Sequence, residues 1–236
     1  MLKSILIEGA KALGLDMTEP QAKKLERYHQ MLAQANARMN LTRVPDDVRE
    51  AADRNYLDCI APLSGGFPKI ATAVDVGSGA GFPGIPLAIM LPEVRFTLID
   101  ALGKRVDFLN EVIGQLGLNA EALHLRAEDA ARSPALREGF DLATARAVAP
   151  MNVLCEYLLP FVRVGGHVLA LKGPGLEAEL AGAENALALL GGELERACPV
   201  QIPGRDWDHR AVWLRKVSPT PDRYPRRAGL AEKRPL

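Results

Sequence analysis

The sequence predicts an α/β fold: a doubly wound, mostly parallel sheet with an antiparallel edge pair and an N-terminal helical extension. Apolar strand-like runs alternate with helical patterns from residue 71 onward, which is typical of parallel strands covered by helices on both faces. Two late strand-like runs, 193–201 and 210–217, have no helix between them and should therefore pair antiparallel at an edge of the sheet.

Residues 1–66 are expected to form a helical cap. Apolar side chains recur at spacings of three and four in two stripes, one from Leu2 to Leu13 and one from Leu25 to Ala35. A third helical stretch runs from about Pro45 to Ile60. The glycine- and proline-containing segment 64–68 then marks the boundary of the next domain.

Residues 67–217 are expected to form the main domain. The strand-like runs before the edge pair cover 71–76, 94–100, 120–125, 140–145 and 167–172. Helical patterns cover 84–91, 103–116, about 128–138, 151–163 and 176–190.

Residues 218–236 are expected to form a basic, proline-rich tail. From Arg215 to the end the chain has seven Lys or Arg residues, two acidic residues and four prolines. The prolines favour an extended conformation. Two interpretations stay open: a solvated terminal segment, or an arm that contacts phosphates.

Composition limits the class of protein only broadly. The 236 residues carry 29 basic and 29 acidic side chains, so a nucleic-acid partner cannot be inferred from net charge. The three cysteines and four histidines, His209 among them, show no metal-ligand spacing, and we interpret them as structural or surface residues. The chain shows neither an export signal nor an apolar run long enough to span a membrane, so we expect a cytoplasmic protein without metal.

A glycine-rich turn after the run 71–76 indicates a nucleotide-like cofactor. Gly77, Gly79 and Gly81 alternate there before a helical pattern begins, and glycine lets the backbone approach a ligand closely. Residues 79–84 also match the dinucleotide pattern G-x-G-x-x-G, which is weak by itself. Asp75, just before the first glycine, would suit a ligand with an ammonium group.

Three further positions at the ends of expected strands support a nucleoside ligand. Asp100 lies 23 residues after Gly77, where a carboxylate can accept hydrogen bonds from ribose hydroxyls. Ala127 and Glu128 follow the third strand, a position typical of adenine contacts, although Glu128 also suits a charged helix start. Arg146 ends the fourth strand, where it could reach into the cleft or form a salt bridge with a local carboxylate.

Several motifs together are similar to the bacterial GidB/RsmG family. They are DVGSGAGFPGIPLAI, LIDALGKRVDFLNEV, RAED, TARAVAP, LALKG and YPRRAGLAEKRPL, and the resemblance extends from residue 40 to the C-terminus. Members of that family are class I, Rossmann-like methyltransferases that methylate N7 of one guanosine in 16S ribosomal RNA. One departure occurs where the family usually reads H-x-x-D-S, because this chain has Asn55 and Cys59 at the His and Ser positions.

The resemblance implies S-adenosylmethionine as cofactor and 16S rRNA, or a small-subunit ribonucleoprotein, as partner. We expect the protein to be a monomer. The resemblance places Gly77, Gly79, Phe82, Asp100, Ala127, Glu128 and Arg146 at the cofactor, with Arg146 as the residue that positions the reaction. Asn40, Asp58, Lys172, Arg226 and Arg227 are weaker candidates for contact with RNA. No general base is expected, because guanine N7 carries a lone pair and no proton.

Two alternatives are left open by the residues alone. A nicotinamide-dependent oxidoreductase would use the same glycine turn and Asp100, and an RNA-binding assembly factor would use only the basic tail. Deletion of 218–236 should, for a methyltransferase, weaken RNA binding in a salt-dependent way and leave cofactor binding intact.

Overall fold

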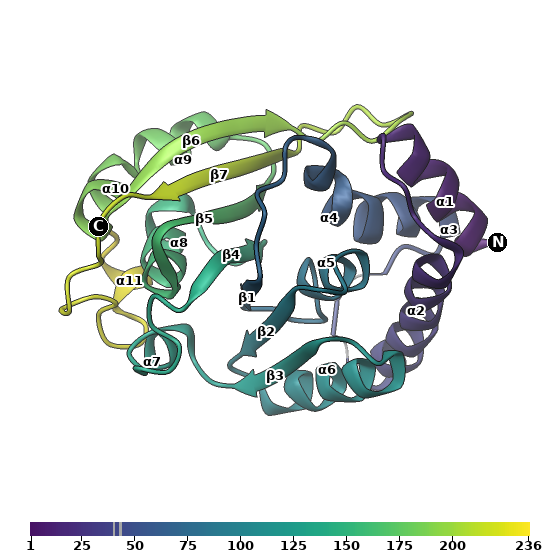
Figure 1. Ribbon diagram of the computed structural model, residues 1–236, viewed down its shortest axis with the longest axis horizontal. Coiled ribbons are helices and arrows are strands. Elements are labelled where there is room, and N and C mark those ends of the chain that lie inside the picture. Colours follow the sequence, from purple (N-terminus) through teal and green to yellow (C-terminus); the bar gives the residue numbers. More distant parts are fainter. Residues whose placement is uncertain (40, 43) are drawn as a thin grey trace.

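A computed structural model describes residues 1–39, 41–42 and 44–236; the substrate candidate Asn40 lies outside the described residues. Within them, one sheet has the strand order β3-β2-β1-β4-β5-β7-β6 (Figure 1). The strands are β1 (Thr72–Val76), β2 (Arg95–Asp100), β3 (Ala120–His124), β4 (Phe140–Arg146), β5 (Val162–Lys172), β6 (Gly192–Pro199) and β7 (Arg210–Lys216). Strands β1 to β5 pair in parallel, and β7 pairs antiparallel with both β5 and β6, which confirms the predicted fold class.

The N-terminal helices pack against two helices of the main domain, on one side of the sheet. The long helices are α1 (Leu2–Ala12) and α2 (Glu19–Met39), and the main domain adds α5 (Gly84–Met90) and α6 (Gly103–Leu116) (Figure 1). Leu6, Leu25 and Tyr28, all from the predicted stripes, are fully buried in one apolar cluster with side chains of α5 and α6. The cap therefore shares its core with the sheet.

The third helical stretch is irregular. It consists of α3 (Val48–Ala51), a π-helical turn η1 (Ala52–Leu57), α4 (Asp58–Ile60) and a 3-10 turn η2 (Ala61–Ser64). A π-helical turn shifts the direction of the side chains that follow it, and such turns occur frequently at functional sites.

The other face of the sheet carries the helices that follow β4. They are α8 (Met151–Leu158), the 3-10 turn η3 (Leu159–Phe161), α9 (Leu176–Ala181), α10 (Glu184–Leu190) and the terminal α11 (Leu230–Lys233).

Two of the predicted helices differ in the structure. Gly182 and Ala183 interrupt the predicted helix 176–190. The predicted helix 128–138 is much shorter, since α7 covers only Ala127–Ala130, and Pro134 disfavours helical backbone at the residue before it.

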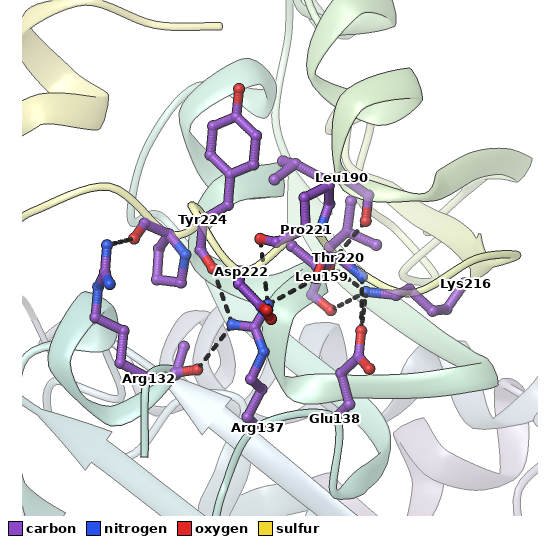
Figure 2. Close-up of polar contacts among 12 residues, drawn as sticks. Arg132, Arg137, Glu138, Leu159, Leu190, Lys216, Thr220, Pro221, Asp222 and Tyr224 are labelled. Carbon is purple, nitrogen blue, oxygen red and sulfur yellow. Dashed lines mark hydrogen bonds and ion pairs between the residues drawn. The ribbon is translucent and has the colours of Figure 1, made fainter. Parts of the chain in front are cut away.

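Residues 218–236, hereafter the C-terminal segment, pack against the main domain and do not extend away from it. Arg137 donates to the backbone oxygens of Thr220 (2.7 Å) and Tyr224 (2.8 Å), and the Tyr224 side chain is buried (Figure 2). Lys216, at the end of β7, is fully buried and donates to the Leu159 oxygen at 2.8 Å. The prolines leave most of the segment without regular structure, but Arg137 binds two of its carbonyl groups.

Candidate active site

The glycine turn folds back onto the neighbouring strand β2. Gly77, Gly79 and Gly81 have φ angles of +71°, +59° and +110°, in the region that favours glycine. The Gly77 N–H donates to the Ile99 oxygen at 2.8 Å. The Gly79 N–H donates to Asp100 Oδ2 at 2.8 Å, so the turn also holds the carboxylate at the end of β2.

A cavity of about 160 Å³, hereafter the first cavity, lies beside this turn. It contains four of the positions expected at the cofactor, namely Gly77, Asp100, Ala127 and Glu128. Its apolar lining comes from Ile99, Leu125 and Val148. Carboxylate acceptors next to an apolar wall suit the hydroxyls and the flat base of a nucleoside. The volume is below that of typical ligand pockets, so it would take only part of such a ligand.

Asp100 is placed to accept further hydrogen bonds. Its side chain is 4% exposed, and Oδ1 accepts from the Leu102 N–H at 2.9 Å. Oδ2 accepts from Gly79 and lies 3.4 Å from the Arg105 guanidinium. Because a carboxylate offers about four lone-pair sites, Asp100 keeps acceptor capacity for a ligand hydroxyl.

Asp75 lies beneath the glycine turn and does not line the first cavity. It is fully buried, and Oδ2 accepts from the Gly84 N–H at 3.2 Å. Oδ1 finds no hydrogen-bond partner among the described residues. Burial in these surroundings raises the pKa of Asp75 to about 7. The sequence allowed Asp75 to hold a ligand ammonium directly or through water, and a direct contact would require the turn to move.

A second cavity of about 340 Å³ lies at the carboxyl ends of β4 and β5, against the π-helical turn η1. It brings together three other predicted residues, Asp58, Arg146 and Lys172. Arg54 and Arg210 add further positive charge to its lining, which also contains the acidic Glu179. The size is within the range of small-molecule sites, and the excess of basic side chains suits an anionic ligand.

Arg146 is held by the helical cap. Its guanidinium donates to the Arg54 backbone oxygen at 2.8 Å and pairs with Asp58 Oδ2 at 3.4 Å. The salt bridge left open by the sequence is therefore present, and its carboxylate comes from the cap. The neighbouring Ala147 has a φ of +55°, an unusual backbone for a residue with a side chain. Ala147 lines the second cavity and the next residue, Val148, lines the first cavity.

His209 also lines the second cavity, a role that the sequence interpretation missed. Its Nδ1 donates to Asp58 Oδ1 at 2.8 Å, so Asp58 binds a histidine and an arginine at once. His209 and Asp58 are 151 positions apart in the chain, so no local sequence pattern connects them. Lys172 donates to the Ala149 oxygen at 2.9 Å and pairs with Glu179 at 2.6 Å.

The candidate cofactor residue Phe82 has contacts other than those expected. Phe82 is 5% exposed and packs in an aromatic cluster with Tyr28 and Tyr56, while the Arg146 guanidinium lies 4.7 Å from its ring centre. Phe82 thus packs against the Arg146 guanidinium and lines neither cavity.

The two arginines of the C-terminal segment differ in their surroundings. Arg226 binds the buried Glu156 through Nε and the terminal nitrogen, so contact with RNA would require this ion pair to open. Arg227 is exposed.

At the positions that depart from the family motif, the side chains are buried. Cys59 Sγ donates to the Asn55 oxygen at 3.3 Å, and burial raises the pKa of its thiol to about 12. Asn55 lines the second cavity, and its side-chain nitrogen has no hydrogen-bond partner among the described residues. The thiol at position 59 is therefore not a nucleophile, because the neutral form is strongly favoured.

Three further features bear on the class of protein. In the described part of the chain, no group of His, Cys, Asp and Glu side chains could hold a metal ion. The three cysteines are free thiols. None of the helices described above has the length and apolar character needed to cross a membrane.

The sheet order, the glycine turn and the acidic end of β2 define a class I methyltransferase fold. A TehB-like S-adenosylmethionine-dependent methyltransferase from Corynebacterium glutamicum has this fold, with a TM-score of 0.50, 16% identity, and coverage of 81% of this chain and 97% of that one. The chain belongs to the GidB family, rRNA small subunit methyltransferase G, whose model matches residues 21–203.

Relatives extend this similarity over almost the whole chain. The ribosomal RNA small subunit methyltransferase G of Clostridium perfringens strain 13 is 43% identical over 98% of both chains. The protein of the same name from Lactobacillus johnsonii is also 43% identical, over 94% of this chain and 95% of its own length.

Proposed function

We propose that this chain transfers a methyl group from S-adenosylmethionine to N7 of a specific guanosine in 16S ribosomal RNA. The observation that carries the proposal is that two different cavities are lined by consecutive residues after β4, Ala147 in one and Val148 in the other. One has the lining of a nucleoside site, and the other has the charge expected for RNA. The relatives at 43% identity are named for methylation of small-subunit ribosomal RNA.

The first cavity would hold the adenosine part of the cofactor. Asp100 would accept hydrogen bonds from the ribose hydroxyls, and Ala127 and Glu128 would contact the base. Gly77 and Gly79 let the backbone approach the ligand without a side chain in the way. S-adenosylmethionine supplies an electrophilic methyl group on its sulfonium when it is bound.

The second cavity would hold the target guanosine. Guanine N7 already carries the attacking lone pair, so the protein does not have to remove a proton there. Its task is to orient the base and exclude water, and such positioning can supply roughly 7–11 kcal/mol of the barrier. Arg146 is the positioning residue, fixed by Asp58 and the Arg54 carbonyl group.

The remaining basic candidates would bind the RNA backbone. Lys172 lies in the second cavity and Arg227 is exposed on the C-terminal segment. RNA bases are read most readily where they are unpaired, so the target guanine would be unstacked to enter the cavity. We further infer a monomer that acts in the cytoplasm on 16S rRNA, either free or within the small subunit.

Mass-spectrometric mapping tests the proposal directly. 16S rRNA from cells with and without this gene should differ by one 7-methylguanosine. Purified protein should restore it on the unmethylated rRNA or small subunit when S-adenosylmethionine is added. Thermal unfolding with S-adenosylhomocysteine or NAD discriminates the cofactor classes. Stabilisation by NAD alone, or no change in rRNA methylation, would contradict the proposal.

A further inference from the structure

The C-terminal segment forms part of the first cavity. Gly229 and Glu232 line it together with Tyr157 of α8. The Gly229 N–H donates to Glu128 Oε1 at 2.8 Å, across 101 positions of the chain. The Tyr157 hydroxyl donates to Glu232 Oε1 at 3.3 Å. One wall of a site that begins at the glycine turn is therefore supplied by the end of the chain.

The segment is held in this position by many contacts upstream of the cavity. Arg132 donates to the Pro225 oxygen, and Arg137 binds the carbonyl groups of Thr220 and Tyr224 (Figure 2). The same view shows Lys216 between Glu138 and the Leu159 oxygen, at the point where the segment leaves β7 (Figure 2).

Between these anchors and the cavity, Arg226 forms a charge-assisted pair with Glu156, whose side chain is 1% exposed. Ala231 of α11 is buried against Val153 and Tyr157 of α8. These contacts place Glu232 at the cavity independently of any ligand.

Glu232 and Glu128 both line the first cavity, as does Tyr157. Burial raises the pKa of the Tyr157 hydroxyl, and the charges of both carboxylates raise it further. Asp100, at the end of β2, is the acceptor for the ribose. Glu128 already accepts the Gly229 N–H through Oε1. Glu232 is exposed to solvent and is bound only through Oε1 to Tyr157 among the described residues, so its second oxygen can accept from a ligand.

We propose that the C-terminal segment is a wall of the cofactor site and that Glu232 accepts a hydrogen bond from the exocyclic amine of adenine. This inference depends on the proposed function, because it assumes an adenosine-containing cofactor. A carboxylate favours an amine donor and disfavours a carbonyl oxygen at the same place. Glu232 therefore selects adenine over hypoxanthine, in which a carbonyl oxygen replaces the amine. Removal of the C-terminal segment should then weaken cofactor binding, contrary to the expectation from sequence that it would leave cofactor binding intact.

Calorimetry with two ligands tests the role of Glu232. The ligands are S-adenosylhomocysteine and S-inosylhomocysteine, its deaminated counterpart. The wild-type chain should prefer the adenosine compound. Glu232→Gln should bind it about 10-fold more weakly, since a neutral amide oxygen replaces the charged acceptor, and should bind the inosine compound no worse. Asp222→Asn is the matched control, because it removes an exposed carboxylate from the same segment away from the cavity.

The outcomes separate the two proposals. If the wild-type chain binds neither ligand, the proposed cofactor is wrong and the role of Glu232 is wrong with it. If the wild-type chain binds S-adenosylhomocysteine while Glu232→Gln has unchanged affinity, or loses affinity equally for both ligands, the contact with the amine is overturned and the proposed function stands. Unfolding temperatures of all three proteins, measured without ligand, should agree, because Glu232 is exposed.

Discussion

The buried Asp75 should make the stability of the chain depend on pH, and Asp75→Asn should remove that dependence. Its carboxyl group has an ordinary pKa of 3.8, which applies to the unfolded chain, and a folded pKa of about 7. Loss of solvation is the main cause, and the charge of Asp100 adds to it. The nearby Ser78 hydroxyl, the Gly84 N–H and the charge of Arg146 oppose the shift without cancelling it.

The sign follows from the protons that each state binds. Between pH 3.8 and 7 the folded chain keeps a proton on Asp75 that the unfolded chain has released. The free energy of unfolding therefore falls as the pH rises through this window. For these two pKa values, the loss between pH 5 and pH 8 is about 2 to 3 kcal/mol.

Urea unfolding of the wild-type chain and Asp75→Asn, without cofactor, measures this loss. The difference between the two free energies of unfolding should change by about 2 to 3 kcal/mol from pH 5 to pH 8. His29 and His167 also have shifted pKa values, but they are present in both proteins and their effects cancel in the difference. Parallel pH profiles would refute the reasoning, because they would mean that the buried carboxyl group is ionised across the whole range.

Three further substitutions test the site. Arg146→Ala should lower kcat/KM for RNA roughly 100-fold, as loss of a preorganised donor does elsewhere, while calorimetry shows nearly unchanged affinity for S-adenosylhomocysteine; full methylation activity would remove Arg146 from the site. Gly77→Ala places a Cβ 2.9 Å from Val148 at a φ of +71°, so calorimetry should show weakened cofactor binding. Its control Gly114→Ala, in α6 with no atom within 4 Å, should raise the free energy of unfolding by up to about 1 kcal/mol; equal cofactor affinities in these two variants would contradict the strain argument. Arg227→Ala should reduce the slope of log K for RNA against log salt by about 0.7, as expected for one lost phosphate contact to a single strand, and an unchanged slope would exclude that contact.

The sheet and the glycine turn could be predicted because both depend on local sequence. Alternation of strand and helix patterns leaves few ways to cover a parallel sheet, and the observed strand order follows the expected class. The positive φ angles of Gly77 and Gly79 need glycine whatever surrounds them. Asp100 follows for the same reason, since the end of the strand after a glycine turn lies beside that turn in any such sheet.

Element lengths were predicted less well than element types. The helix expected over 128–138 stops at Ala130, and β5 begins at Val162, five residues before the expected run. The apolar pattern of η1 looks like an ordinary helix, yet the turn is π-helical and carries Arg54 and Asn55 to the second cavity. Such details depend on packing against the sheet, which local periodicity does not describe.

The sequence by itself thus determined the fold class, the glycine turn and the family, because these depend on short-range patterns and on motifs. Only the tertiary structure showed that Asp58 joins Arg146 to His209, or that Gly229 and Glu232 complete the first cavity. The basic composition of the C-terminal segment suggested contact with phosphates. In the structure, one of its basic side chains, Arg226, instead binds the buried Glu156. These contacts join residues 70 to 151 positions apart. They depend on how the helices and strands pack, which cannot be read from local spacing along the chain.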